Sequence, residues 1–497
     1  MSATPETTAA LTHRSACELA ADVRSGTLGA VEVTQAHLDR IAEVNPAVNA
    51  VQDLQAHTAL EQARAIDAQP DQARSNLPLA GLPVAVKDLA PTAGFRYTQG
   101  SPIFADRVAG ADALFVSRMR AAGAVMIGKT NTPEFGLGSH TFNSVYGATR
   151  NPYDLARTAG GSSGGAAAAV ATRMLPIADG SDTGGSLRNP ASFCNVVGLR
   201  PSLGKVPNVP ADFPYSTLSV KGPMARTVRD TALLMSTMIG NDLRDPFSVD
   251  EDPTRYLDVA GSPPGDRIGK QRLRVAWTPD FSGSFPVETS VLEVLEPVIS
   301  QLAETETEMR VESAHPDLSG AHEAFCALRG LQVLATLGPL ALMHPEKLKE
   351  DARWNVEVGR RVTGVQASKA HRVQGINFQR MAQFLTDYDV LLTPTCQVPP
   401  FEVGQRYPRQ IGSSAMADYL EWMALPSAIS LTSHPAISVP VGFTAEGHPV
   451  GLQIVGRYRS EAALLEYAKR IEAICGSSVE APQTDFSVPQ ERFPEIL

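Results

Sequence analysis

Two short loops of glycine and serine are the residues best suited to chemistry in this sequence. Residues 160–165 read GGSSGG, and residues 184–186 read GGS at the end of a DTGGS run. Because glycine lacks a side chain, such loops let backbone amides approach a bound anion or oxyanion. The first loop leads into an alanine-rich helix and the second follows a predicted buried strand. Hydroxyl groups from two elements can therefore converge, as acyl transfer by an activated serine requires.

This segment, taken with residues 82–88 (LPVAVKD), resembles the signature of the amidase signature family of serine hydrolases. The resemblance extends from about residue 15 to residue 474, and its three separated motifs occur in the family's order. It implies a Ser-Ser-Lys triad. Ser186 would be the nucleophile, Ser162 the bridging serine and Lys87 the base.

The resemblance also assigns supporting residues around the two loops. It implies a cis peptide bond between Gly161 and Ser162, with Ser163 completing the serine pair. For Asp182 and Arg188, it suggests a buried ion pair that braces the second loop, whereas their spacing alone fits a solvated pair equally well. The oxyanion that develops during acyl transfer needs preorganised donors. We expect them to be four backbone amides: Thr183, Gly184, Gly185 and Ser186.

Lys87 must be neutral to act as a base, although a free lysine has a pKa of ~10.4. Residues 82–88 read as a short buried strand, so the alternation of side chains should turn Lys87 and Asp88 to opposite faces. The apolar residues 83–86 predict a desolvated site, which disfavours the ammonium form. Without the resemblance, an ordinary surface lysine at a strand end would be the simpler interpretation.

Alternating strand and helix patterns predict an α/β protein. The resemblance adds a large mixed, twisted β-sheet with α-helices on both faces. We expect one domain over residues 1–497. Its parts are N-terminal helices at 15–70, a catalytic core at 71–205, a motif-poor and largely helical region at 206–390, and a return to the sheet with a C-terminal helix at 391–497.

Several local expectations accompany this division of the chain. An early helix should stop at Asn45-Pro46, and Asp112 should cap another helix. Residues 241–266 read as a solvated surface connection, and the loops at 136–143 and 396–408 should line the site.

Two other motifs and one cysteine are typical of other functions, but their sequence contexts disfavour those functions. Residues 123–130 (GAVMIGKT) satisfy the phosphate-loop pattern, but the middle residues read as a buried strand and Pro133 resists a helix after the lysine. Residues 202–205 (SLGK) match SxxK, yet Pro201 and Gly204 predict a turn rather than a helix. Cys326 reads as a packed apolar residue, because nothing near it in sequence marks a thiolate.

Residues 160–164 also satisfy GxSxG, the nucleophile elbow of α/β hydrolases, so a Ser-His-Asp esterase stays open as an alternative mechanism. That interpretation lacks a clear strand before the elbow and leaves the loop ending in Ser186 without a role. It would draw on one of six downstream histidines: His315, His322, His344, His371, His434 and His448.

Composition limits the partners. The chain has 497 residues, 43% of them hydrophobic, and a net charge of −10, which disfavours nucleic acid and anionic membranes. Five scattered cysteines define neither a disulfide framework nor a zinc site. The first eleven residues lack a secretory pattern and no stretch of 18 apolar residues occurs, so we expect a cytoplasmic monomer or homodimer. No metal and no organic cofactor are implied.

The sequence therefore predicts an amidase that hydrolyses the C–N bond of a small amide through an acyl-enzyme on Ser186. An ester or a carbamate is a variant of the same chemistry, since members of the family cleave both. Two alternatives of other classes remain: a glutaminase-type subunit of a tRNA amidotransferase, and a binding module that uses the glycine loops without forming a covalent adduct.

Overall fold

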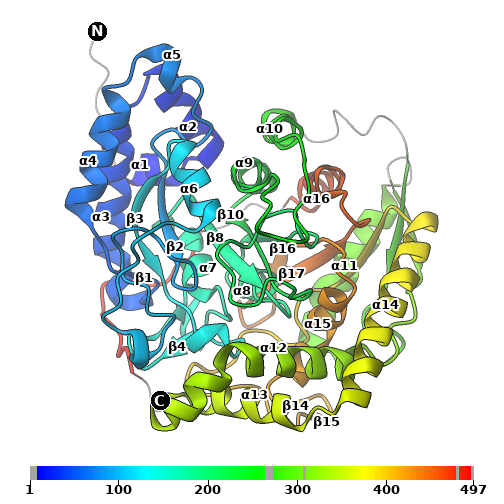
Figure 1. Ribbon diagram of the computed structural model, residues 1–497. Coiled ribbons are helices and arrows are strands. Elements are labelled where there is room, and N and C mark those ends of the chain that lie inside the picture. Colours follow the sequence, from blue (N-terminus) through cyan, green and yellow to red (C-terminus); the bar gives the residue numbers. More distant parts are fainter. Residues whose placement is uncertain (1–7, 264–271, 306–308, 477–480, 494–497) are drawn as a thin grey trace.

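A mixed sheet of eight strands forms the centre of the computed structural model, which describes residues 8–263, 272–305, 309–476 and 481–493 (Figure 1). The strand order is β12-β11-β13-β17-β16-β9-β10-β8. β11 runs parallel to β12 and β13, and the other neighbouring pairs are antiparallel. The bounds are β8 (Ile177–Asp182), β9 (Val197–Arg200), β10 (Val220–Ala225), β11 (Leu273–Trp277), β12 (Met309–Ser313), β13 (Val390–Pro394), β16 (Ala436–Phe443) and β17 (Pro449–Val455).

A smaller sheet carries the strand that ends in Lys87. Its order is β1-β3-β2, with β1 (Val51–Gln52), β2 (Pro83–Lys87) and β3 (Val125–Thr130). β2 lies beside β8 of the large sheet, and the backbone N–H of Lys87 donates to Asp179 Oδ1 at 3.0 Å. The strand that ends in Lys87 therefore adjoins the strand that leads to Ser186.

Helices flank the large sheet on both faces, so the predicted α/β architecture is confirmed. α9 (Val228–Met238), α11 (Thr289–Glu304) and α16 (Glu461–Cys475) form one layer, in which α16 contacts the other two. α7 (Gly164–Ala171) and α8 (Arg188–Phe193) contact each other and pack against strands of the same sheet. Every residue of α7 and α8 is buried, which explains why α7 consists of alanine, glycine and a valine.

The N-terminal helices pack around the smaller sheet, at the left of Figure 1. They are α1 (Thr8–His13), α2 (Ala16–Ser25), α3 (Ala30–Val48), α4 (Ala56–Asp67), α5 (Asp71–Arg74) and α6 (Leu114–Ala121). The expected stop at Asn45 is wrong, because α3 continues through Pro46 and buries Ala47 and Val48. The free energy gained by burying these two side chains offsets the loss of the backbone hydrogen bond that proline cannot make.

Asp112 does not cap α6. The N-cap residue is Ala113, and it makes no side-chain cap hydrogen bond. Asp112 instead accepts a hydrogen bond from the backbone N–H of Ala93 at 2.7 Å and pairs with Arg120 at 3.0 Å. A carboxylate at this position was free to satisfy a more distant amide and a cation rather than the helix that follows it.

The helices of the middle region lie together at the foot and right of Figure 1. They are α12 (Ala321–Met343), α13 (Glu350–Arg361) and α14 (Gly364–Asp387), and α15 (Ala424–Leu431) packs against α12 and α14. By length and composition, α12 is the one described helix that meets the criteria for crossing a membrane. Here it packs against α13, α14 and α15.

The predicted surface connection at 241–266 contains a short helix, α10 (Thr254–Gly261), which buries Tyr256 and Val259 against α9 and α16. Residues 264–266 lie outside the described residues. The remaining strands form two-stranded pairs: β4 (Phe142–Asn143) with β5 (Gly147–Ala148), β6 (Arg150–Asn151) with β7 (Asp154–Thr158), and β14 (Gln410–Ile411) with β15 (Ser414–Ala415).

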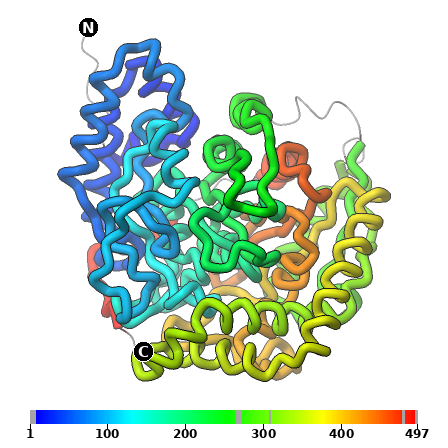
Figure 2. The backbone as a smooth tube through the Cα atoms, viewed as in Figure 1, coloured from blue at the N-terminus to red at the C-terminus, as the bar shows by residue number. Residues whose placement is uncertain are grey.

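The C-terminal segment, red in Figure 2, lies beside the N-terminal part of the chain at the lower left. The backbone N–H of Ala148 donates to Arg492 O at 2.7 Å, and Arg150 Nη2 donates to Glu491 O at 2.9 Å. The C-terminal segment is thus tied to the loops that precede residue 160.

Candidate active site

The side chain of Lys87 ends among three hydroxyl groups. Its Nζ lies 2.8 Å from Ser162 Oγ, 2.7 Å from Ser163 Oγ and 3.0 Å from Ser181 Oγ. Only 1% of Lys87 is exposed, so the interpretation as a surface lysine is wrong. Two of these serines come from the first glycine-serine loop, and Ser181 comes from β8.

Burial lowers the pKa of Lys87 well below its ordinary value, and the positive charge of Lys221 lowers it further. Asp179 and Asp182 act in the opposite direction without reversing the shift. Asp88 lies on the other face of the strand, as the alternation predicts, where its carboxylate accepts a backbone N–H from residue 98 at 3.1 Å. The lysine is thereby separated from its acidic neighbour.

The two glycine-serine loops contact each other directly. The peptide bond between Gly161 and Ser162 is cis, as the resemblance implies. Ser139 Oγ donates to Gly161 O at 2.9 Å, and the backbone N–H of Ser163 donates to Ser186 O at 3.3 Å. The loop that carries Ser162 thus contacts both Lys87 Nζ and the backbone of Ser186.

Ser162, Ser181, Thr183, Gly184 and Ser186 line a cavity of about 220 Å³. Ser186 is 8% exposed. In the described part of the chain its hydroxyl makes no hydrogen bond, not even to Ser162 Oγ. The Ser186 hydroxyl is therefore available to a molecule in the cavity. Lys87 does not itself line the cavity, and Ser162 and Ser181 both contact its Nζ and line the cavity.

The backbone of the second loop differs from expectation at one position. The Gly185 N–H donates to Asp182 Oδ1 at 2.8 Å, so this amide is already occupied. For the amides of Thr183, Gly184 and Ser186, no acceptor lies within hydrogen-bonding distance among the described residues. Gly185 has a φ of +126°, a conformation that other residues rarely adopt, which turns its N–H back toward Asp182.

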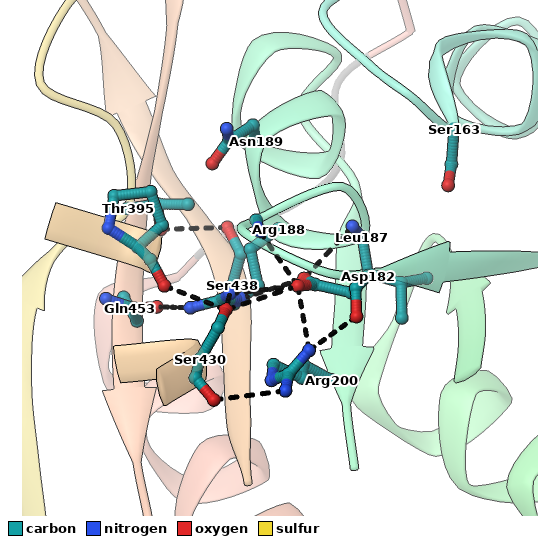
Figure 3. Close-up of polar contacts among 12 residues, drawn as sticks. Ser163, Asp182, Leu187, Arg188, Asn189, Arg200, Thr395, Ser430, Ser438 and Gln453 are labelled. Atoms are coloured by element: carbon teal, nitrogen blue, oxygen red, sulfur yellow. Dashed lines mark hydrogen bonds and ion pairs between the residues drawn. The ribbon is translucent and has the colours of Figure 1, made fainter. Parts of the chain in front are cut away.

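Asp182 and Arg188 form a buried ion pair, which settles the alternative that their spacing left open (Figure 3). Arg188 Nε and Nη2 lie 3.0 and 3.1 Å from the two carboxylate oxygens, and Arg200 Nη1 lies 3.1 Å from one of them. Burial alone would raise the pKa of Asp182, but Arg188 and Arg200 hold it well below its ordinary value. Ser430 Oγ and Gln453 Oε1 accept hydrogen bonds from Arg188 Nη2 and Nη1 at 2.6 and 2.5 Å.

Sequence reasoning missed three partners in this network: Arg200, Ser430 and Gln453. It also missed Ser181, although the alternation of β8 could have placed that residue two positions from Asp179, on the face toward Lys87. No local signal marks Ser430 or Gln453, since they lie 242 and 265 positions from Arg188 in the chain.

The walls of the cavity confirm one expectation about the loops and contradict another. The loop at 136–143 contributes Gly136, Leu137 and Gly138, as predicted, but the loop at 396–408 does not line the cavity. The region at 206–390, which carries no recognisable motif, supplies much of the wall through residues 208–221 and through α12.

The rival motifs do not assemble their sites in the described residues. Lys129 of the phosphate-loop pattern lies within β3, and its Nζ donates to Ala90 O at 2.6 Å. Ser202 and Lys205 lie in a turn, and Lys205 pairs with Glu251 and Glu461. Burial raises the pKa of the Cys326 thiol to about 12, which keeps it protonated.

No histidine lines the cavity in the part of the chain that the structure describes. The Ser-His-Asp alternative therefore lacks its base. Likewise, the described residues contain no group of three or more His, Cys, Asp or Glu side chains that could hold a metal ion.

Comparison with known proteins agrees with the fold. A sequence model of the Amidase family matches residues 32–465. An acylamidase of Rhodococcus erythropolis is 36% identical over 465 residues, covering 93% of this chain and 95% of that protein. One chain of the glutamyl-tRNA(Gln) amidotransferase of Nitrosococcus oceani is 35% identical over 482 residues, covering 93% and 97%. The crystal structure of a bacterial aryl acylamidase of the amidase signature family is 28% identical, with a TM-score of 0.84 over 93% of this chain and 96% of that one.

The family match and the similarity to acylamidases, on the same fold, identify a hydrolase of carbon–nitrogen bonds. The chain belongs to the Amidase family, that of the amidase signature enzymes.

Proposed function

We propose that the enzyme hydrolyses a small amide through an ester-linked acyl-enzyme on Ser186. Ser186 Oγ attacks the carbonyl carbon while its proton passes to Ser162, whose own proton passes to neutral Lys87. The same path returns a proton to the nitrogen of the leaving amine as the C–N bond breaks. Water then attacks the ester by the reverse relay, which releases the acid and restores Ser186.

One observation carries this proposal: a buried lysine whose Nζ contacts hydroxyl groups and, in the described residues, forms no ion pair. A lysine placed to hold a charge would be expected to have a carboxylate partner. The separation of 2.8 Å from Ser162 suits a hydroxyl that donates to a neutral amine as well as the reverse. The lowered pKa of Lys87 supports the neutral form.

The oxyanion would be bound by the amides of Thr183, Gly184 and Ser186. These N–H groups are unoccupied among the described residues, whereas the Gly185 amide is held by Asp182. Asp182 accepts hydrogen bonds from the amides of both Gly185 and Leu187, on either side of Ser186. The carboxylate therefore holds the loop in position before the substrate arrives, which is the condition for effective oxyanion stabilisation.

The size of the cavity favours a small substrate. At about 220 Å³ it is smaller than pockets that enclose drug-sized ligands, which run to ~300–1,000 Å³. An aryl amide, an ester or a carbamate would follow the same path. Turnover of a panel of anilides, aliphatic amides, amino-acid amides and carbamates would rank these classes.

Covalent labelling tests the mechanism. Ser186→Ala should lose the mass increase that a fluorophosphonate probe gives the wild type. Ser162→Ala should still be labelled, but turnover should fall by ~10²–10⁴ because the proton relay is interrupted. Ser202→Ala, at the serine of the competing SxxK pattern, is the matched control and should behave as wild type. Unchanged labelling of Ser186→Ala would contradict the proposal.

A second candidate function is that of a glutaminase chain in a tRNA-dependent amidotransferase, since the amidotransferase chain of N. oceani is 35% identical over almost the same length. That function predicts a stable partner and glutamine hydrolysis that the partner stimulates. Size-exclusion chromatography of the tagged protein with and without cell lysate, followed by a glutaminase assay of each peak, separates the two. A monomeric or homodimeric peak that hydrolyses anilides favours the independent amidase.

A further inference from the structure

The wall of the cavity contains two basic side chains, Arg329 and Lys221, neither of which takes part in the chemistry proposed above. Neither forms an ion pair with any acid in the described part of the chain. The one acidic residue that lines the cavity among the described residues is Asp212, which is exposed. The wall of the cavity next to Ser186 therefore contains basic side chains that no acid of the described residues pairs with.

Arg329 lies close to the loop that carries the nucleophile. Phe325, four residues earlier on α12, packs so tightly against Gly184 that a Cβ there would lie 2.6 Å from its ring. Residues four apart on a helix share a face and are separated by ~6 Å along the axis. Arg329 is thus placed about one helical turn from the proposed oxyanion hole, in the wall of the same cavity.

The partners of Arg329 are neutral. Its Nη1 donates to Asn355 Oδ1, and its guanidinium lies 5.4 Å from the centre of the Tyr419 ring. The carboxylate of Asp351, on the same helix as Asn355, is already paired with Lys349 at 2.9 Å and with Arg406. Only 6% of Arg329 is exposed, so its charge is neither well hydrated nor neutralised.

Lys221 lies on β10, beside the strand that leads to the second loop. It pairs with Ser181 across β10 and β8, and Ser181 in turn contacts Lys87. Burial lowers the pKa of Lys221, with Asp179 acting against that shift. When protonated, Lys221 adds to the positive potential of the cavity.

A buried guanidinium without a carboxylate is costly, and a ligand that supplies the carboxylate recovers that cost in charge-assisted hydrogen bonds. We propose that the amide cleaved by this enzyme carries a carboxylate a few carbon atoms from the scissile carbonyl, and that Arg329 binds this group. Lys221 contributes positive potential without direct contact. The proposal rests on the acyl-enzyme chemistry at Ser186, and the carboxylate itself undergoes no chemical change.

A matched pair of chromogenic anilides provides the test. The 4-nitroanilide of succinic acid carries a terminal carboxylate, and that of 4-oxopentanoic acid replaces it with an uncharged methyl ketone of the same shape. Release of 4-nitroaniline is followed for both on the same sample. The ratio of their kcat/KM values does not depend on the folded fraction of a variant.

The wild type should prefer the succinyl substrate, and Arg329→Gln should lower the ratio by roughly 10- to 100-fold, mainly through KM. Arg329→Lys should retain part of the preference because it keeps the charge. Arg380→Gln, on the exposed face of α14, is the control and should leave the ratio unchanged.

A wild type that prefers the ketone, or an Arg329→Gln ratio equal to that of wild type, would overturn the proposal. A ratio that falls only in Lys221→Met would overturn the assignment to Arg329. Ser186→Ala distinguishes an error in the mechanism from an error in the substrate assignment. If it abolishes hydrolysis of both anilides while the ratio is insensitive to Arg329, the mechanism stands and the substrate assignment is wrong. If it cleaves both, the mechanism itself is wrong.

Discussion

Replacing Asp182 by asparagine should destabilise the fold strongly, because this carboxylate is surrounded by donors. It accepts hydrogen bonds from Arg188 twice, from Arg200, and from the backbone amides of Gly185 and Leu187, at 2.8 to 3.2 Å. Its side chain is fully buried, as is that of Arg188, and Arg200 is 1% exposed. Asparagine keeps one acceptor oxygen, turns an NH₂ toward the other donors, and leaves two buried arginines without a counter-charge.

The expected loss in the free energy of unfolding is ~3–5 kcal/mol, the usual cost of removing one partner from a buried ion pair. This is a large part of the ~5–15 kcal/mol that stabilises a typical protein. Urea unfolding followed by fluorescence measures it as a shift of the midpoint. Glu357→Gln, which breaks an exposed pair with Arg361, is the control and should cost less than ~0.5 kcal/mol.

The penalty should also depend on pH in a defined direction. Because the folded-state pKa of Asp182 is lowered, its contribution is present above the unfolded value of ~3.9 and is lost as pH falls toward the folded value. The difference between wild type and Asp182→Asn should therefore be constant from pH 5 to 8 and shrink below pH ~4. A variant whose midpoint matches that of Glu357→Gln at pH 7 would refute the argument.

Four further predictions concern activity. In the wild type, kcat/KM should rise with pH. Both Lys87→Ala and Lys87→Arg should abolish the activity and its pH dependence, and the arginine fails because a guanidinium stays protonated. Lys87→Arg activity above a few per cent of wild type would exclude Lys87 as the base. Lys221→Met, assayed on the neutral anilide, should move the rise of kcat/KM to higher pH, since removing a nearby positive charge raises the pKa of Lys87. An unchanged pH profile would show that the two lysines are not coupled. Gly184→Ala should lower kcat by ~10²–10³, because a Cβ would lie 2.6 Å from Phe325 and displace an oxyanion donor; near-normal turnover would remove that amide from the mechanism. His434→Ala should keep at least about a tenth of kcat/KM, as it lies outside the cavity; a loss of three decades in a folded variant would restore the Ser-His-Asp alternative.

The parts of the site that sequence reasoning located are those with a strong local signal. Alternation along residues 82–88 predicted that Lys87 and Asp88 diverge, and the structure confirms it. The glycine-serine loops could be recognised because a run of glycine and serine is typical of a loop whose backbone amides approach a bound molecule. The buried pair of Asp182 and Arg188 could be suggested from the resemblance, but whether it was buried depended on residues far along the chain.

The parts that could not be predicted depend on long-range contacts. Arg200, Ser430 and Gln453 reach Asp182 or Arg188 from strands and a helix whose placement follows from the sheet topology. The use of the Gly185 amide by Asp182 depends on a single backbone angle. The cavity wall from α12 has no motif, because a wall needs only shape and a few side chains, which many sequences provide.

The separate packing of α12 has a consequence for how this enzyme can change. The strands that position Lys87 and Ser186 belong to one hydrophobic core, whereas Phe325 and Leu328 of α12 pack into a second and Val333 and Leu337 into a third. Apart from Phe325, which packs against Gly184, mutations on the cavity face of α12 therefore leave the core beneath the nucleophile intact. Substrate preference can drift during evolution, or be selected from a laboratory library, while the bond-breaking machinery is inherited unchanged.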